Sequence, residues 1–302
     1  MDDPLKNNPT RTGGPLISLA RRLQNKTGKL SLWIILASIL LTVILIGLFY
    51  LYLPLGVDWR DTYQPSTLEL LRGHSPYDIV PFVNPPWILL PLIPLAILPD
   101  KLGCAIWAVL SLYAYGYVAF KFGAKPLALL ALIFSYPVLF DLFYGQIDAL
   151  IILGFLMPPG IGIFFVLAKP QIGIGIAVFW AIEAWRKEQF RGLVKLLVPV
   201  SIAFLLSFIL YGTWFLRARN SIPLTVNAAL WPQAIPIGLA LLVYAIRTRS
   251  KNISILSSPF LSPYMGPHSW AVALLGLLPN QIELIIASVG LWVAVVLKGG
   301  WL

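Results

Sequence analysis

Charged side chains are scarce in this sequence. Asp, Glu, Lys and Arg make up 11% of its 302 residues, whereas 59% of the residues are hydrophobic. A soluble domain carries about 25% charged residues, because its water-facing surface has to be covered by polar groups. This composition excludes an ordinary soluble globular domain, and most of the chain must have lipid as its solvent.

Cysteine and histidine are almost absent as well. Cys104 is the one cysteine, which excludes an intrachain disulfide framework and a cysteine-based zinc site. His74 and His268 are the two histidines, too few for a metal site built from several histidines. The sequence also holds no Walker A loop, nucleophile elbow or HExxH pattern. We therefore expect neither a metal ion nor another cofactor.

Long apolar runs make up much of the rest. A helix needs about 20 largely apolar residues to cross roughly 30 Å of membrane hydrocarbon. Residues 32–53 meet this requirement without a single charge. Runs of similar character lie at residues 102–120, 127–140, 193–210, 235–246 and 282–297. Because every backbone N–H and C=O must be satisfied inside hydrocarbon, the sequence predicts an all-α, polytopic transmembrane helical bundle over residues 32–302.

The net charge of +10 does not indicate a nucleic-acid partner, because the basic residues fall in short segments between the apolar runs. Such segments are typical of cytoplasmic loops. Residues 1–31 precede a run that is too long for a signal peptide and lacks a small-residue cleavage motif. We interpret residues 1–31 as a cytoplasmic basic segment and the first run as a retained anchor in the cell membrane. The basic residues of this segment are Lys6, Arg11, Arg21, Arg22, Lys26 and Lys29.

The later segments are expected to alternate between the two faces of the membrane. Residues 54–100 then form an extracytoplasmic loop with interfacial helices. Its proline-rich end, residues 85–99, is short for a span, so we expect it to lie at the outer interface or to re-enter there. A crossing by residues 85–99 would reverse the side of every later loop. The polar residues expected on the outer face are Asp58, Asp61, Gln146, Asp148, Lys169, Arg217, Arg219 and His268.

Polar groups at membrane depth are costly, which makes these residues functional candidates. Asp58 directly follows the first run, where a carboxylate in a partly desolvated cleft could take a proton from a hydroxyl. Asp61 is a further candidate for binding the donor phosphate or the substrate, and it stands where it could cap a short amphipathic helix that ends at Gly73. The alternative for both aspartates is a structural role as helix caps that pair with Arg60 or Arg72.

The three later basic residues also have two interpretations each. Lys169 could bind a phosphate as a point charge, or it could extend its ammonium group to the interface as a structural residue. Arg217 and Arg219 could hold a phosphate or a lipid head group, or they could be ordinary interfacial anchors.

The remaining candidates lie in two turns. Gln146 and Asp148 follow Gly145, which permits a close backbone approach; the alternative is a polar turn with a cap for the next helix. His268 stands in a loop rich in proline and glycine, and a structural role is its alternative.

Several motifs follow one another in a fixed order between residues 32 and 278. They are Asp58 after the first run, Leu70-Leu71-Arg72-Gly73-His74-Ser75-Pro76-Tyr77, Phe82-Val83-Asn84-Pro85-Pro86, Gly145-Gln146-Ile147-Asp148, Lys169-Pro170, and the loop from Ser258-Pro259-Phe260 to His268. Their order and spacing resemble glycosyltransferase family 87. That family belongs to the GT-C superfamily of membrane transferases and includes polyprenol-phosphate-mannose-dependent mannosyltransferases.

The resemblance implies a GT-C-like fold and a reaction on the extracytoplasmic side. A sugar, mannose or another hexose, would move with inversion from a polyprenyl-phosphate donor to a hydroxyl of a glycolipid, glycan or protein acceptor. Asp58 matches the loop-1 aspartate of the family, which is the expected base. Lys169 is our candidate for holding the departing phosphate. We add Arg217 and Arg219 only because of their positive charge and their expected side of the membrane. His268 is expected to position the phosphate or the acceptor.

Two other classes of function stay open. A lipid or polyprenyl-phosphate transporter would need charged residues midway along its spans and an internal repeat, and the sequence shows neither. A non-catalytic membrane subunit would tolerate the replacement of Asp58.

Overall fold

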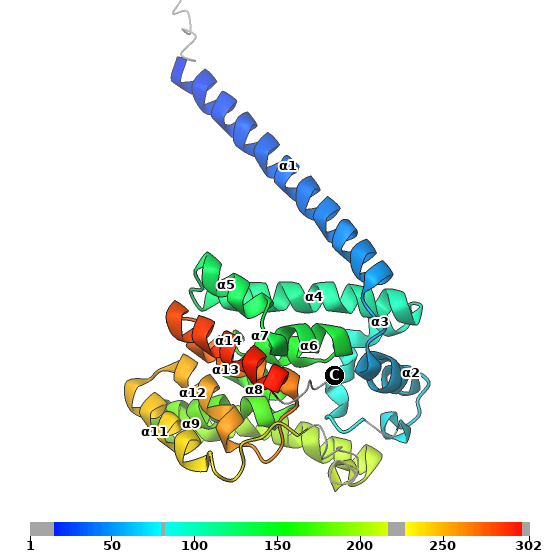
Figure 1. Cartoon of the computed structure of the whole chain (residues 1–302), viewed down its shortest axis with the longest axis vertical. Coiled ribbons are helices and arrows are strands. Elements are labelled where there is room, and N and C mark those ends of the chain that lie inside the picture. The colour runs from blue at the N-terminus through cyan, green and yellow to red at the C-terminus, as the bar shows by residue number, and fades with distance from the viewer. Residues whose placement is uncertain (1–14, 80–81, 217–226, 298–302) are drawn as a thin grey trace, which may run out of the picture. The chain divides into compact units, whose positions relative to one another are not determined.

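The computed structural model describes the backbone of residues 15–79, 82–216 and 227–297, and their side chains from Ser31 onward. The described residues contain helices and no strand (Figure 1), which confirms the all-α prediction. The chain divides into two compact units, Met1–Gly47 and Leu48–Leu302. The α-helices are α1 (Pro15–Tyr52), α2 (Gln64–Leu71), α3 (Ile93–Ala96), α4 (Asp100–Lys121), α5 (Pro126–Ile133), α6 (Tyr136–Tyr144), α7 (Asp148–Gly154), α8 (Pro159–Val166), α9 (Pro170–Tyr211), α11 (Ile235–Thr248), α12 (Lys251–Ser257), α13 (Ala271–Leu277) and α14 (Gln281–Leu297). The short elements are the π-helical turn η1 (Trp59–Tyr63) and the 3-10 turns η2 (Pro76–Asp78), η3 (Pro86–Leu92), η5 (Ser258–Leu261) and η6 (Pro267–Trp270).

Three helices among the described residues are long and apolar enough to cross a membrane. They are the Ser31–Tyr52 part of α1, α4 and α9, and the bent pair of α5 and α6 is a fourth if it forms one broken span. Large hydrophobic side chains on these helices are exposed, for example Leu40, Phe120 and Ile209. Apolar surface of this extent is typical of a protein that is solvated by lipid.

The apolar run at residues 127–140 gives two helices where the sequence predicts one span. α5 ends at Ile133, α6 begins at Tyr136, and the two are bent by 50°. Pro137 stands at the start of α6. A proline has no N–H, and its ring clashes with the carbonyl group four residues earlier, which here belongs to Ile133. The helix therefore stops at Ile133 and resumes in a new direction.

The longest helix, α9, reverses direction near its middle. Glu188 and Gln189 have non-helical backbone angles, and Gln189 has a positive φ of 50°. The ring of Trp87 packs against Phe204, in the second half of α9, while its Nε1 donates to the carbonyl oxygen of Phe164 in α8. α8 also packs on the first half of α9, where a Cβ on Gly162 would lie 2.7 Å from the Trp180 ring. The second half of α9 therefore runs back beside the first, and a Cβ on Gly192 would clash with the carbonyl oxygen of Ala184. The second half contains the predicted run 193–210.

The other apolar segments form helices that are too short to span alone. α11 has 14 residues and α14 has 17, so the runs at 235–246 and 282–297 are helical but below the length of about 20 residues that a span requires. The proline-rich segment forms η3 and α3, which together are also short. α7 and α8 fold back on each other so closely that a Cβ on Gly162 would lie 2.5 Å from the carbonyl oxygen of Gly154.

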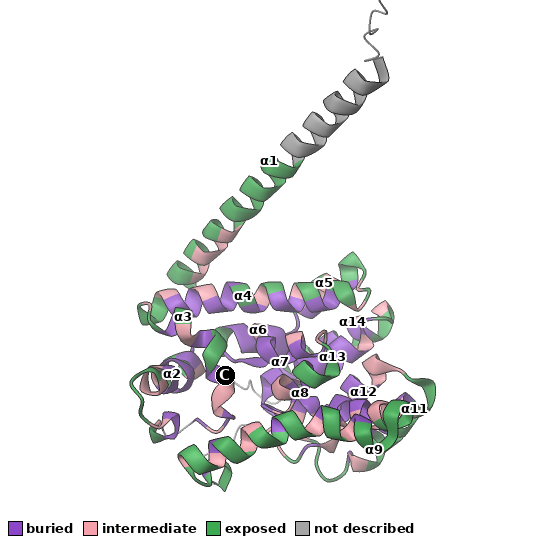
Figure 2. Ribbon diagram, turned by 180° about the vertical axis from the view of Figure 1, so that it is seen from behind, coloured by how far each residue is buried: buried purple, intermediate pink, exposed green. Residues whose placement is uncertain are grey.

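The core of the second unit is formed by its shortest helices. Figure 2 shows α6 and α7 mostly buried, and six of the seven residues of both α7 and α13 are buried. The largest fully buried side chains include Trp59 in η1 and Tyr115 in α4. These elements carry or adjoin most of the polar residues singled out by the sequence.

Several helix ends and turns of the second unit contact one another. Lys251 donates to the carbonyl oxygen of Phe155 at the end of α7 and lies 5.7 Å from the centre of the Phe122 ring after α4. Arg186 donates to the carbonyl oxygen of Ile246 near the end of α11. The side of the membrane on which these segments lie stays a prediction.

Candidate functional site

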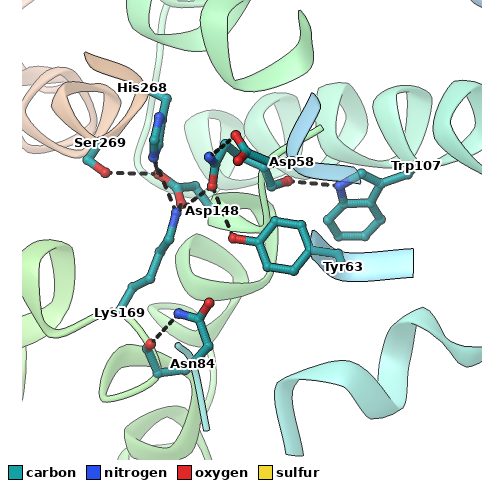
Figure 3. Close-up of polar contacts among 10 residues, drawn as sticks. Asp58, Tyr63, Asn84, Trp107, Asp148, Lys169, His268 and Ser269 are labelled. Atoms are coloured by element: carbon teal, nitrogen blue, oxygen red, sulfur yellow. Dashed lines mark hydrogen bonds and ion pairs between the residues drawn. The ribbon is translucent and has the colours of Figure 1, made fainter. Parts of the chain in front are cut away.

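Four separate segments bring their polar side chains together in one hydrogen-bonded network (Figure 3). Asp58 comes from the residue before η1, Gln146 from the turn between α6 and α7, Asp148 from the start of α7, Lys169 from the residue before α9, and His268 from η6. These five residues are among the eight polar residues that the sequence predicts on the outer face. We call them the polar cluster.

Asp58 is the most accessible member of the polar cluster. It is half-buried, and the side-chain amide of Gln146 donates to its Oδ2 over 2.5 Å. Burial raises the pKa of Asp58 above 3.8, while Lys169 and the hydrogen bond from Gln146 act in the opposite direction. Its second oxygen, Oδ1, accepts no hydrogen bond from the described residues. Asp58 therefore has a base oxygen available, held in a partly desolvated position.

Lys169 is the cation of the polar cluster, and its three N–H donors are all engaged. Its Nζ forms an ion pair with Asp148 Oδ1, donates to Gln146 Oε1 over 2.8 Å, and lies 3.3 Å from His268 Nε2. An ammonium group has three donors and no acceptor. Lys169 is also only 5% exposed. The side chain is thus a buried counter-ion in this state, with no donor left over for a phosphate.

His268 is uncharged in this environment. Burial and the neighbouring Lys169 lower the pKa of His268 to about 3. Because Nε2 faces the Lys169 ammonium as an acceptor, the imidazole proton belongs on Nδ1, and Nδ1 has no hydrogen-bond partner. The ring stacks against Phe140, with 6.0 Å between centroids, and a Cβ on Gly266 would lie 2.4 Å from His268 Cε1.

Two glycines allow the segment before η1 to reach the turn after α6. Gly145 ends α6 with a positive φ of 68°, a conformation that favours glycine. A Cβ on Gly145 would lie 2.7 Å from Trp59 Cβ, and a Cβ on Gly56 would lie 2.7 Å from the backbone of Tyr144. This close approach places Asp58 beside Gln146.

Gln146 is fixed from several directions. Trp107 in α4 donates from Nε1 to the Gln146 backbone oxygen over 2.8 Å, and the Tyr63 hydroxyl donates to Gln146 Oε1 over 3.2 Å. Since Lys169 and Tyr63 both donate to Oε1, the amide nitrogen must face Asp58. Gln146 thus links the orientation of Asp58 to the ion pair between Lys169 and Asp148.

The segment between α2 and η3 is also tied to the segment that carries Lys169. Asn84 Nδ2 donates to the carbonyl oxygen of Ala168 over 2.9 Å, and the Tyr77 hydroxyl donates to the carbonyl oxygen of Asn84 over 2.9 Å. The Tyr77 ring stacks on Trp214, with 5.0 Å between centroids. The motifs at residues 70–77 and 82–86 therefore support the position of Lys169 without entering the polar cluster.

Asp61 lies outside the polar cluster; it caps no helix, whereas its alternative pairing with Arg60 is confirmed. It sits inside η1, is exposed, and forms an ion pair with Arg60 at 2.6 Å. The hydrogen bond from Arg60 lowers the pKa of Asp61. The helical path begins at Trp59, whose backbone and Cβ lie against Gly145 and whose buried indole lies against Gly103. Asp61, two residues later, is exposed to solvent.

The helix α2, which covers most of the predicted amphipathic helix, buries polar side chains. α2 has buried Gln64, Ser66 and Thr67, whereas Leu71 is 47% exposed. The Gln64 side chain donates to the backbone oxygens of Ala96 and Leu98. The polar face packs inward because it satisfies backbone groups of the following loop. Arg217 and Arg219 lie outside the described residues.

Asp141 is a neighbour of the polar cluster that sequence reasoning missed. It is 1% exposed on the inner face of α6, and Asp148, Lys169 and Asp58 lie close enough to act on it electrostatically. The available signal was an acidic residue at the end of an apolar run, which is costly in a membrane. With Asp58, Asp148 and Asp141 against Lys169, the site holds three carboxyl groups and one ammonium group.

Among the described residues, no group of three or more His, Cys, Asp or Glu side chains is arranged to hold a metal ion. The site therefore offers a base oxygen, a neutral imidazole and amide groups, a donor and acceptor set suited to hydroxyl groups. No family model, no curated protein and no solved structure matches the chain, so its chemistry rests on this geometry and on the motifs of its sequence.

Proposed function

We propose that the chain is a membrane glycosyltransferase that moves a sugar, mannose or another hexose, from a polyprenyl-phosphate donor to an acceptor hydroxyl on the extracytoplasmic face. The observation that carries the proposal is the half-buried Asp58, with one oxygen held by Gln146 and the other available. The motif order that resembles glycosyltransferase family 87 gives the reaction class, and a GT-C-like arrangement of the spans belongs to the same proposal.

In the proposed reaction, Asp58 takes the proton of the acceptor hydroxyl as that oxygen attacks the anomeric carbon. The new carbon–oxygen bond forms while the bond from the anomeric carbon to the phosphate oxygen breaks. The phosphate leaves with the bonding electrons, and the configuration at the anomeric carbon is inverted. A positioned general base of this kind contributes about 10²- to 10⁴-fold in rate.

The engaged donors of Lys169 change one assignment made from the sequence. Lys169 holds Gln146 and Asp148 in place, so its part in the reaction is to position Asp58. A direct contact with the phosphate would require the ion pair with Asp148 to open. Arg217 and Arg219 keep their proposed role at the phosphate.

The proposal is tested by sugar transfer in vesicles that contain the purified chain and a polyprenyl-phosphate sugar. We expect Asp58→Asn to lower the rate about 10²- to 10⁴-fold. Asp61→Asn is the matched control, because Asp61 is exposed and paired with Arg60, and it should keep the wild-type rate. Equal rates for wild type and Asp58→Asn would remove Asp58 as the base.

The orientation belongs to the proposal and is tested separately. Replacing the single buried thiol by Cys104→Ser gives a background for single cysteines at exposed positions 74 and 249. We expect a membrane-impermeant thiol reagent to label position 74 only from outside and position 249 only from the cytoplasmic side. Labelling of both positions from the same side of the membrane would contradict the proposed orientation.

A proton-coupled transporter of a lipid phosphate is the second candidate. The buried carboxyl group of Asp141 favours it, since an ionisable residue within a possible broken span was not expected from the sequence. The same vesicles separate the two functions. A transporter would move the labelled lipid phosphate across the bilayer and leave its sugar bond intact.

A further inference from the structure

Tyr264 carries a phenol beside the polar cluster that the proposed reaction does not use. It lies in the loop between η5 and η6, four residues before His268, and its side chain is partly exposed. Asp58, Asp148 and Tyr63 all lie within electrostatic reach of the phenol. Because these three groups belong to η1, the residue before it and the start of α7, their common neighbour must face the polar cluster.

The loop is fixed on both sides of Tyr264. Asn227 Nδ2 donates to the carbonyl oxygen of Pro263 over 3.1 Å, and Asn227 Oδ1 accepts from the backbone N–H of Met265 over 3.0 Å. Met265 is fully buried, and its carbonyl oxygen accepts from the N–H of Ala228 over 2.7 Å. The backbone at Tyr264 is thus held in place, which is what a preorganised hydrogen-bond donor requires.

The hydroxyl group of Tyr264 is available to a ligand. It forms no hydrogen bond within the described ranges of the chain, and its oxygen is not enclosed by protein. The Lys169 ammonium and the Tyr63 hydroxyl are engaged within the site, and His268 Nδ1 is enclosed. Burial and the neighbouring carboxylates raise the pKa of Tyr264 above its ordinary value of 10. The phenol therefore keeps its proton and is a donor at neutral pH.

The proposed reaction creates a demand for such a donor. When the bond from the anomeric carbon to the phosphate oxygen breaks, a bridging oxygen, which is a weak acceptor, becomes a charged oxygen of a phosphate monoester. A hydrogen bond to that oxygen is strongest in the transition state and in the product, and so it accelerates the reaction.

The position of Tyr264 relative to Asp58 suits this demand. In a displacement with inversion the anomeric carbon lies between the base and the leaving oxygen, so a donor to the leaving oxygen has to stand near the base without touching it. Tyr264 is near enough to Asp58 for their charges to interact, and the two form no hydrogen bond.

We propose that the Tyr264 hydroxyl donates a hydrogen bond to the departing phosphate oxygen of the lipid donor. The inference rests on the proposed function, because it takes that reaction as given. The oxygen leaves with the bonding electrons, Tyr264 keeps its proton, and the proton of the acceptor hydroxyl goes to Asp58. Tyr264 thereby makes a contact with the phosphate that the engaged Lys169 does not make in this state.

The test compares wild type with Tyr264→Phe in the vesicle assay of sugar transfer. We expect kcat to fall by about 10- to 100-fold, the effect of losing a hydrogen bond to a charged group. KM for the donor should change little, because the bridging oxygen is a weak acceptor before the bond breaks. The melting temperature should stay that of wild type. Tyr244→Phe is the matched control, since Tyr244 is 56% exposed on α11, and it should keep the wild-type kcat.

Farnesyl phosphate locates the contact, because it carries a phosphate monoester and no sugar. As an inhibitor of sugar transfer it should bind Tyr264→Phe about 10- to 100-fold more weakly than wild type. A lower kcat with unchanged inhibition would place the contact on the sugar and overturn the assignment to the phosphate.

The remaining outcomes separate this inference from the proposed function. Equal kcat values for wild type and Tyr264→Phe would overturn the inference and leave the proposed function standing. A lower melting temperature of Tyr264→Phe would show that the hydroxyl supports the fold, which also overturns the inference. Absence of sugar transfer by wild type would overturn the proposed function and the inference with it.

Discussion

Replacement of Lys169 by methionine tests the interpretation of this residue as a buried counter-ion. Lys169→Met keeps the apolar length of the side chain and removes its charge. Asp148, 1% exposed, would then be a buried carboxylate without its partner. Breaking a buried pair in this way costs about 3–5 kcal/mol. Gln146 would also lose the donor to Oε1 that holds its amide toward Asp58.

The assay is chemical unfolding in detergent micelles, with a double-mutant cycle. Lys169→Met alone should lower the free energy of unfolding by the full amount, and addition of Asp148→Asn should recover most of it, because no unpaired charge remains. Lys195→Met is the matched control: its ion pair with Glu188 is exposed, so about 0–1 kcal/mol is expected. Unchanged stability in Lys169→Met would refute this reasoning and restore Lys169 as a free phosphate ligand.

Three further predictions follow from the same geometry. The pKa of His268 is lowered from 6.5 to about 3, so below about pH 6.5 the unfolded chain binds a proton that the folded chain does not. The free energy of unfolding should therefore fall by up to about 1.4 kcal/mol per pH unit below that pH. Unfolding measured at two pH values should show a smaller loss in His268→Gln than in wild type, and equal losses would contradict a neutral His268. Gly56→Ala places a Cβ 2.7 Å from the Tyr144 backbone and should lower the free energy of unfolding by about 1–3 kcal/mol. Gly116→Ala, which has open space around it, should not lower it, and similar thermal unfolding of the two variants would contradict the tight contact at Gly56. Tyr63→Phe removes one of the two donors to Gln146 Oε1 and should slow sugar transfer less than Asp58→Asn does, because Lys169 still orients the amide.

The all-helical fold could be predicted from composition and the lengths of the apolar runs. The run at 102–120 became α4, and the run at 32–53 became the apolar part of α1. Both are governed by a local requirement, the satisfaction of backbone groups inside each helix. The break at Pro137 has a local cause as well and could have been predicted from the missing N–H.

The reversal within α9 has a signal in the sequence, because the basic residues Arg186, Lys187 and Arg191 precede the apolar run at 193–210 and are typical of a loop between two spans. Its exact position was not predictable, because Glu188 and Gln189 are themselves compatible with a helix. The inward polar face of α2 was also not predictable, because Gln64 satisfies backbone oxygens about 30 residues away in sequence.

Eight candidate residues could be grouped from the sequence because polar residues at span ends are few, and five of them form the polar cluster. The hydrogen bonds and ion pairs among them could not be predicted from the sequence. Proximity to a span end does not distinguish Asp58, whose partner Gln146 is 88 residues away, from Asp61, whose partner is the adjacent Arg60. Asp141 was missed for a related reason: a single acid within an apolar run gives no indication of which side chains it will face.

The most direct test of the central claim is the anomeric configuration of the transferred sugar. The purified chain would be supplied with a polyprenyl-phosphate mannose of known configuration and a glycolipid acceptor, and the product linkage determined by nuclear magnetic resonance. Asp58 acting as a base in a single displacement predicts a product with the inverted configuration. Retention of configuration, or no transfer at all from the lipid-linked donor, would contradict the account.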